Sequence, residues 1–254
     1  MSQITTLEKQ NKNKPITDSK IKIKIKEFIH PIMLMLSKTK IKYKINKVNK
    51  YNSISGKPII FAINHTNCND IPIACNAIKE HGYLLIGKQG LEKMDEIFFN
   101  LNGVIYVDRK NKDDTTLSKD AMCSYLKKNK NLIVFPEGTW NLTDNLLMLN
   151  MKWGIVDIAR EADAQIIPVV LDYDDKNMVC SAKFGEPIVV ESSDFDRHEF
   201  SEKIEKSFQD FMDAHFKEIQ NGEFDGYTYL YKRKLSWWKK IEKRLKNIGM
   251  KKKV

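Results

Sequence analysis

The sequence has few of the residues that dominate fibrous, disulfide-stabilised and membrane-spanning proteins. Glycine (11 residues) and proline (7) are too rare among 254 residues for a fibrous or low-complexity chain. The spacing of the four cysteines (Cys68, Cys75, Cys123 and Cys180) matches no zinc or redox motif, and such sparse cysteines suit a reducing compartment. No apolar run exceeds about six residues, whereas a membrane-spanning helix needs about 20. We therefore expect no polytopic membrane protein. The first twenty residues are polar, so we also expect no secretory signal.

The net charge of +10 is distributed unevenly. Residues 1–50 carry 13 lysines and three acidic residues, and residues 226–254 carry 11 basic residues and one acidic residue. Residues 51–225, in contrast, carry 19 basic and 29 acidic residues. An acidic body therefore lies between two basic ends, which can bind nucleic acid, anionic lipid or an acidic protein.

Apolar side chains with helical spacing accompany both basic ends. The C-terminal set consists of Leu235, Trp238, Ile241, Leu245 and Ile248. Its opposite face is rich in lysine, a pattern typical of helices that lie in a membrane interface, and residues 26–38 repeat it. We therefore expect a peripheral protein on an anionic membrane surface, without a nucleic-acid partner. The alternative is that both apolar faces pack against the acidic body.

Short, wholly apolar segments alternate with amphipathic ones along the interior of the chain. Strands are expected near 41–45 and at 58–63, 82–87, 103–107, 132–135, 166–171 and 187–190, and helices at 71–78, 91–101, 115–128, 153–162 and 195–216. The pattern predicts an α/β fold with a mostly parallel central sheet flanked by helices. We expect a disordered tail at 1–18, an amphipathic helical segment at 19–38, one domain at 39–225 and a basic amphipathic segment at 226–254.

Polar residues follow the strand expected at 58–63. His65 and Asp70 lie five positions apart across a strand-to-helix turn, where the carboxylate can orient the imidazole as a base. No serine or cysteine nucleophile is clearly paired with them, and Cys68 is interpreted as a packing residue. The arrangement favours direct activation of a substrate hydroxyl. The alternative is that Asp70 only caps the helix that follows it.

Two more strands end in polar residues. Arg109 follows the strand at 103–107, where a guanidinium can capture a phosphate; a local ion pair with Asp108 is the alternative. Pro136, Glu137, Gly138 and Thr139 follow the strand at 132–135. A glycine allows close backbone approach there, and nearby amides can hold an anion, although such a turn is common by itself.

Taken together and in order, these clusters resemble the glycerolipid and lysophospholipid acyltransferases typified by 1-acyl-glycerol-3-phosphate acyltransferase. That family carries His and Asp separated by four residues, a Gly…Arg strand end, a Phe-Pro-Glu-Gly-Thr block and a strand with an embedded proline, at 166–170 here. The resemblance covers residues 57–190 and makes 39–225 an acyltransferase domain.

The resemblance implies the roles of the site residues. His65 is the general base, and Asp70 orients it. Arg109, Glu137, Gly138 and Thr139 place the acceptor, classically through its phosphate, and amides near Gly138 add an oxyanion site. The acyl donor is acyl-coenzyme A or acyl-carrier protein, and no metal or redox cofactor is bound.

One residue departs from the family pattern. Trp140 stands where the family has an arginine that helps bind the acceptor phosphate. As a substrate-binding residue, Trp140 suits an apolar, sugar or quaternary-ammonium group. The alternative is that Trp140 packs and that Lys152 or Lys88 supplies the charge. We expect a lysophospholipid acceptor; a glycan or other lipid hydroxyl, and a non-catalytic membrane-binding protein, are the alternatives.

Composition also bears on the source of the chain. Lysine outnumbers arginine 38 to 5, and Ile and Asn are abundant, a bias typical of AT-rich bacterial genomes. Combined with the resemblance, this bias predicts an enzyme of phospholipid synthesis or remodelling on the cytoplasmic face of the membrane.

Overall fold

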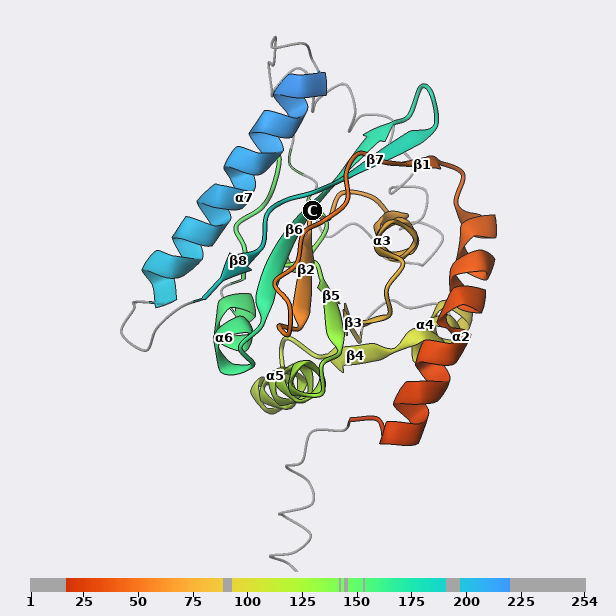
Figure 1. The fold of residues 1–254 in the computed structure, drawn as a ribbon, viewed down its shortest axis with the longest axis vertical. Coiled ribbons are helices and arrows are strands. Elements are labelled where there is room, and N and C mark those ends of the chain that lie inside the picture. Colours follow the sequence, from red (N-terminus) through yellow and green to blue (C-terminus); the bar gives the residue numbers. More distant parts are fainter. Residues whose placement is uncertain are drawn as a thin grey trace, which may run out of the picture.

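The computed structural model describes residues 17–88, 93–141, 143, 146–152, 154–190 and 197–219 (Figure 1). The strands are β1 (Lys44–Lys47), β2 (Ile59–Ile63), β3 (Gly82–Gly87), β4 (Val104–Val107), β5 (Asn131–Val134), β6 (Gln165–Asp174), β7 (Val179–Phe184) and β8 (Ile188–Val189). The helices are α2 (Lys20–Lys40), α3 (Asp70–Ile78), α4 (Lys93–Asn102), α5 (Lys112–Lys127), α6 (Gly154–Glu161) and α7 (Arg197–Ile219).

The strands of the described residues form one eight-stranded sheet with the order β1-β7-β6-β2-β5-β3-β4, and β8 pairs with β6. Strands β6, β2, β5, β3 and β4 run parallel, as does β1 with β7, while β7 and β8 run antiparallel to β6. The carboxyl ends of the central parallel strands therefore meet at one edge of the sheet.

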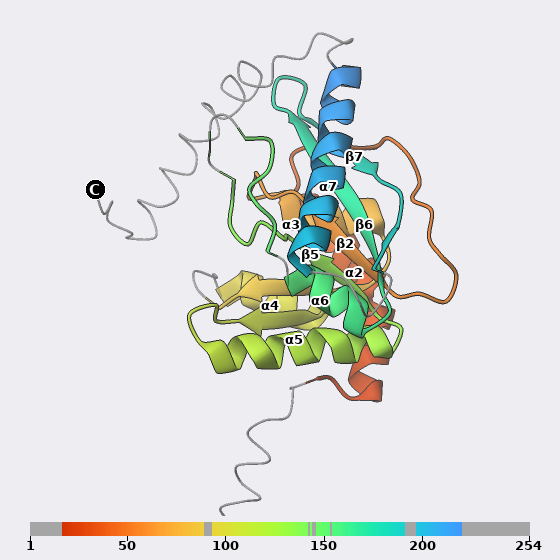
Figure 2. The same cartoon turned by 90° about the vertical axis from the view of Figure 1, so that its left-hand side faces the viewer.

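Helices cover both faces of this sheet, because its central strands are apolar on both sides. In β2, Ile60 and Ala62 face one core, and Phe61 and Ile63 face the other. Helices α5, α6 and α7 pack on the first core and α3 and α4 on the second, as Figures 1 and 2 show. The predicted α/β architecture with a mostly parallel, helix-flanked sheet is confirmed.

Strand β7 is the main element that the sequence did not predict. Its buried residues, Cys180, Ala182 and Phe184, alternate with half-buried ones, and two of them are small. The hydrophobic signal is therefore weak, and the strand forms because it pairs with β6 along six residues. The first strand also differs, since β1 begins at Lys44 rather than near residue 41.

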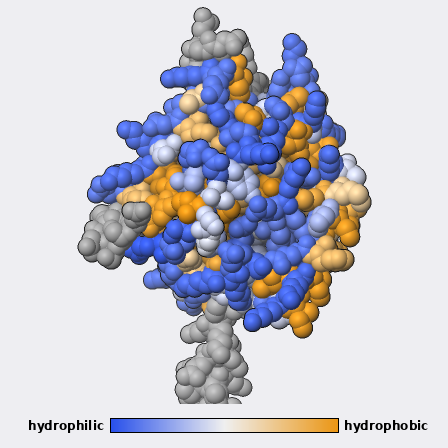
Figure 3. Space-filling model, viewed as in Figure 1, coloured by the Kyte–Doolittle hydropathy of each residue, from blue (hydrophilic) through white to orange (hydrophobic). Residues whose placement is uncertain are grey.

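Helix α2 corresponds to the expected amphipathic segment at 19–38. Ile23, His30 and Met33 are buried, and the helix packs against α3 and α4, so one face docks on the body as the packing alternative required. A second row remains at the surface, at the right of Figure 3. This exposed α2 stripe consists of Ile21, Ile25, Phe28, Ile32 and Met35, which are 52–79% exposed.

The expected tail at 1–18 lies almost wholly outside the described residues, and the basic segment at 226–254 lies entirely outside them. Within the part of the chain that the structure describes, no helix has the length and apolarity to span a bilayer.

Candidate active site

The three polar clusters predicted from the sequence lie at the carboxyl ends of β2, β4 and β5. His65 follows β2, Arg109 follows β4, and Glu137 follows β5. In open α/β sheets this edge is where ligands bind, because strand ends and helix starts leave side chains and backbone groups free to face a cleft.

His65 and Asp70 form a hydrogen-bonded pair. The Nδ1 atom of His65 lies 2.8 Å from Oδ2 of Asp70, which also accepts the backbone amides of Thr66 and Asn67 at 2.7 and 2.8 Å. A fully buried carboxylate that accepts several N–H groups is held as an acceptor, so Nδ1 carries the imidazole hydrogen. Nε2 therefore keeps its lone pair and can accept a proton. Asp70 therefore contacts the imidazole of His65 in addition to the backbone amides that a capping residue would bind.

Tyr173 completes this pair from β6. Its hydroxyl donates to Oδ1 of Asp70 at 2.5 Å, and burial of Tyr173 raises the pKa of its phenol well above the ordinary value. The sequence did not single out Tyr173, because it lies 103 positions from Asp70 and only the sheet brings them together.

Two aromatic rings flank the imidazole. The ring of Phe135 lies 4.4 Å from that of His65, centroid to centroid, at an interplanar angle of 32°. The ring of Trp140 approaches edge-on at 5.8 Å. Trp140, the residue that replaces the family's arginine, therefore packs beside the imidazole.

Glu137 is buried behind this site. Its Oε1 accepts the backbone amide of His65 at 2.7 Å, and its Oε2 accepts the backbone amide of Leu149 at 2.8 Å. The backbone amide of Asn141 donates to the carbonyl of His65 at 2.7 Å. The contacts of Glu137 thus fix the turn that carries His65, whereas the sequence placed Glu137 against the acceptor.

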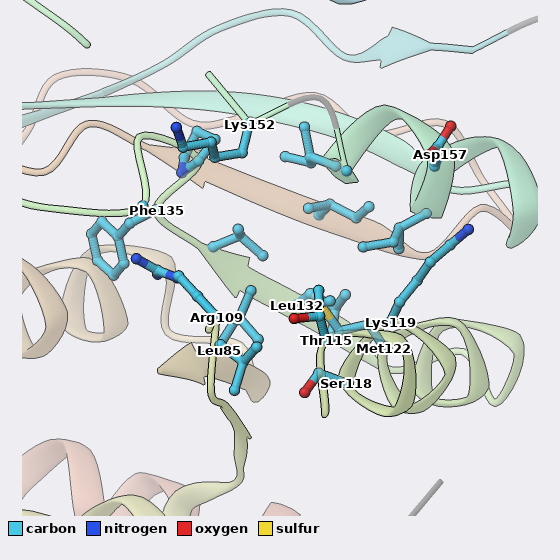
Figure 4. Close-up of a pocket in the computed structure, with 18 of the residues that line it drawn as sticks. Leu85, Arg109, Thr115, Ser118, Lys119, Met122, Leu132, Phe135, Lys152 and Asp157 are labelled. Carbon is cyan, nitrogen blue, oxygen red and sulfur yellow. The ribbon is translucent and has the colours of Figure 1, made fainter. Parts of the chain in front are cut away.

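A cavity of about 530 Å³ lies between β2, β5, α5 and α6. Its walls are mainly apolar and include Ile60, Leu85, Met122, Leu132, Ile155 and Ile158. Arg109, Phe135 and Lys152 lie at one end, and Lys119 and Asp157 lie at the other (Figure 4). An apolar cavity with cations at one end can accept an alkyl chain that carries an anionic group.

The predicted binding residues divide between the cavity and its surroundings. Arg109 and Gly138 line the cavity, whereas Glu137, Thr139 and Trp140 do not. Arg109 forms no ion pair with Asp108, whose Oδ1 accepts the amide of Lys110 instead. Partial burial of the guanidinium lowers the pKa of Arg109.

The oxyanion site expected from amides near Gly138 does not include the amide of Gly138 itself. The amide of Gly138 donates to the carbonyl of Phe135 at 3.0 Å and closes a turn, so this N–H is not available to a substrate oxygen. The positive φ of Gly138, +77°, explains why a glycine is needed there.

No group of three or more His, Cys, Asp or Glu side chains that could hold a metal ion occurs among the residues described in the structure. Cys68, Cys75, Cys123 and Cys180 form no disulfide with one another, and Cys68 is the exposed one.

Comparison with known proteins adds to this geometry. The model of the acyltransferase family matches residues 44–172. The 1-acyl-sn-glycerol-3-phosphate acyltransferase of Saccharomyces cerevisiae is 28% identical over 199 residues, which are 72% of this chain and 63% of the yeast protein. The enzyme of the same name from Cocos nucifera is 31% identical over 128 residues, 47% of this chain and 39% of that protein. The chain thus spans less than two thirds of the length of these curated relatives.

A solved structure shares the fold. The crystal structure of the 1-acyl-sn-glycerophosphate acyltransferase PlsC from Thermotoga maritima superposes with a TM-score of 0.56 at 16% sequence identity. The match covers 74% of this chain and 81% of that protein.

Proposed function

The chain belongs to the acyltransferase family, and from this premise we propose that it moves a fatty acyl group from a thioester to the hydroxyl of a lysophospholipid such as 1-acyl-glycerol-3-phosphate. The observation that carries the proposal is the His65–Asp70 pair, in which Nδ1 is occupied by the buried carboxylate and Nε2 is left as a base. The relatives named 1-acyl-sn-glycerol-3-phosphate acyltransferase support this acceptor class.

The proposed reaction is a direct transfer. Nε2 of His65 takes the proton of the acceptor hydroxyl while the hydroxyl oxygen attacks the thioester carbonyl. The carbon–sulfur bond then breaks, and the leaving thiolate takes the proton back from the imidazolium. Asp70 stabilises that imidazolium by its negative charge and holds the ring in place. Atoms and charges balance without a metal or redox cofactor, so none is part of the proposal.

The acyl donor is proposed to be acyl-coenzyme A or acyl-carrier protein, because both present a fatty acyl thioester. Purified full-length chain is incubated with either donor and with 1-acyl-glycerol-3-phosphate, a lysophosphatidylcholine or a monoacylglycerol. Thiol release and the mass of the lipid product are measured. Formation of a diacyl product from 1-acyl-glycerol-3-phosphate supports the proposal, and failure of both donors with every acceptor contradicts it.

A second acceptor class follows from Trp140. Because this position lacks the family's arginine, a glycan or another lipid hydroxyl without phosphate is the alternative acceptor. Faster turnover of the monoacylglycerol than of the phosphate-bearing acceptor in the same panel would favour that alternative.

We also propose that the protein binds the membrane peripherally, on its cytoplasmic face. The exposed α2 stripe is supported by exposed lysines on the same helix, Lys20, Lys22, Lys24, Lys38 and Lys40. Each basic residue near an anionic bilayer contributes about 1 kcal/mol, and the apolar side chains add burial. The free, sparse cysteines favour a reducing compartment.

Co-sedimentation with anionic vesicles tests this surface. Phe28→Glu combined with Ile32→Glu introduces two charges into the stripe and is expected to weaken binding at least tenfold. Val48→Glu, at an exposed apolar residue outside α2, is the matched control and should bind as the wild type does. Equal binding by the α2 variant and the control contradicts the proposed surface.

A further inference from the structure

Two cationic side chains converge on Gly138. A Cβ atom at this position would lie 3.3 Å from Nη1 of Arg109 and 3.5 Å from Cγ of Lys152. The missing side chain of Gly138 therefore leaves room beside the guanidinium of Arg109 and the alkyl part of Lys152, at the end of the cavity that Figure 4 shows with both residues.

Neither cation is neutralised within the part of the chain that the structure describes. The printed sequence offers many carboxylates, yet neither Arg109 nor Lys152 forms an ion pair with one of the described residues. Partial burial lowers the pKa of Arg109, because desolvation disfavours the charged guanidinium. An anion bound beside both side chains would stabilise their charged forms.

Other lysines near the site are already paired. Lys88 forms an ion pair with Asp114. At the far end of the cavity, Nζ of Lys119 lies 3.3 Å from Oε2 of Glu161. Of the two lysines that the sequence offered as replacements for the family's arginine, Lys88 is thus neutralised and Lys152 is not.

We propose that Lys152 is the second phosphate-binding cation of this enzyme and acts with Arg109 on the acceptor's phosphate, in place of the arginine that Trp140 has displaced. A phosphate monoester carries about −1.5 to −2 charges at neutral pH, so two cations match it where one does not. The guanidinium of Arg109 contributes hydrogen-bond donors with fixed directions, and the ammonium of Lys152 contributes a compact positive charge. This inference rests on the proposed acyltransferase function and narrows its acceptor to phosphate-bearing lysophospholipids.

The test is a comparison of Lys152→Gln with Lys127→Gln, at an exposed lysine of α5 that does not line the cavity. Acceptors are 1-acyl-glycerol-3-phosphate and a monoacylglycerol with the same chain. Lys152→Gln should raise KM for the phosphate-bearing acceptor at least tenfold, change its kcat by less than about threefold, and leave KM for the monoacylglycerol unaltered. Lys127→Gln should discriminate between the acceptors as the wild type does. Because Lys152 is exposed, its substitution does not disturb the core.

A rescue variant sharpens the assignment. Trp140→Arg in the Lys152→Gln background returns a cation to the family's position and should recover KM for the phosphate-bearing acceptor. Lys152→Arg should keep it near the wild-type value. An unchanged KM in Lys152→Gln, or a selective rise in Lys88→Gln instead, overturns the assignment.

Binding of sn-glycerol 3-phosphate separates this inference from the proposed function. Calorimetric titration should detect binding to the wild type and a loss of at least tenfold in Lys152→Gln. A wild type that binds this ligand but transfers no acyl group contradicts the function and keeps the site. A wild type that transfers acyl groups with no dependence on Lys152 contradicts the site and keeps the function.

Discussion

The hydroxyl of Tyr173 and Oδ1 of Asp70 lie 2.5 Å apart, so β6 supplies a third partner to the His65–Asp70 pair. Oδ2 of the same carboxylate serves His65 and two backbone amides. Both oxygens of Asp70 are thus fixed, and the carboxylate cannot rotate away from the imidazole without breaking a buried hydrogen bond.

Tyr173→Phe should slow catalysis without abolishing it. Loss of the donor frees one oxygen of the Asp70 carboxylate, so the carboxylate holds the imidazole less firmly in place. We expect kcat to fall about tenfold, with KM little changed. Tyr51→Phe, which removes a phenol bonded to Glu80 away from the site, is the control. A kcat equal to that of the wild type in Tyr173→Phe would contradict this positioning role.

Glu137 should matter for the shape of the site more than for substrate binding. Glu137→Ala leaves the amides of His65 and Leu149 without their acceptor, whereas Glu137→Gln keeps one. An unsatisfied buried donor costs about 1–3 kcal/mol, so urea unfolding should rank stability as wild type, Gln, then Ala. The exposed residue Glu186 provides the control Glu186→Ala. A raised KM in Glu137→Gln at unchanged stability and kcat would instead indicate contact with the acceptor.

Thiol labelling should follow burial. Cys68 is exposed, whereas burial raises the pKa of Cys75 to about 12 and that of Cys123 to about 11. Because the thiolate is the reactive form, a maleimide at pH 7.5 should modify Cys68 first and the other cysteines only on unfolding. Mass spectrometry of digested protein identifies the site. Early labelling of Cys75 would contradict the packing of α3 on the sheet.

Acid should destabilise the protein through His81. Burial lowers the pKa of His81 to about 4, while its Nε2 lies 2.6 Å from the carbonyl of Asn102. The unfolded chain takes up this proton near pH 6.5 and the folded chain only near pH 4, so stability is full above pH 6.5 and is lost as the pH falls toward 4. His81→Gln should show a shallower decrease in unfolding free energy between pH 6.5 and 4.5, measured in urea. Parallel curves for wild type and variant would contradict this.

The sequence predicted the central sheet because β2, β3, β5 and β6 are apolar on both faces. Such short apolar segments are typical of parallel strands that helices cover on both sides. It did not predict β7, which depends on pairing with β6 rather than on its own pattern. Local hydrophobic spacing thus predicts strands with a strong apolar pattern of their own. It misses strands that form mainly because they pair with a neighbouring strand.

The same division holds at the site. His65 and Arg109 follow strands, and Asp70 begins the helix after the same turn as His65, so local order places them at one edge. The hydrogen bond from Tyr173 and the aromatic contact of Phe135 depend on strands that are adjacent only in space. The sequence also did not reveal that Glu137 accepts the backbone amides of His65 and Leu149, because a motif does not show which way a side chain points.

Thiol release by His65→Ala tests the central claim most directly. The variant is compared with the wild type at saturating acyl thioester and 1-acyl-glycerol-3-phosphate, after urea unfolding has confirmed that both are folded. Removal of the base should reduce kcat by at least 10²-fold, the scale of general base catalysis, while KM for the acceptor changes little. A folded His65→Ala variant that releases thiol at the wild-type rate would contradict the account.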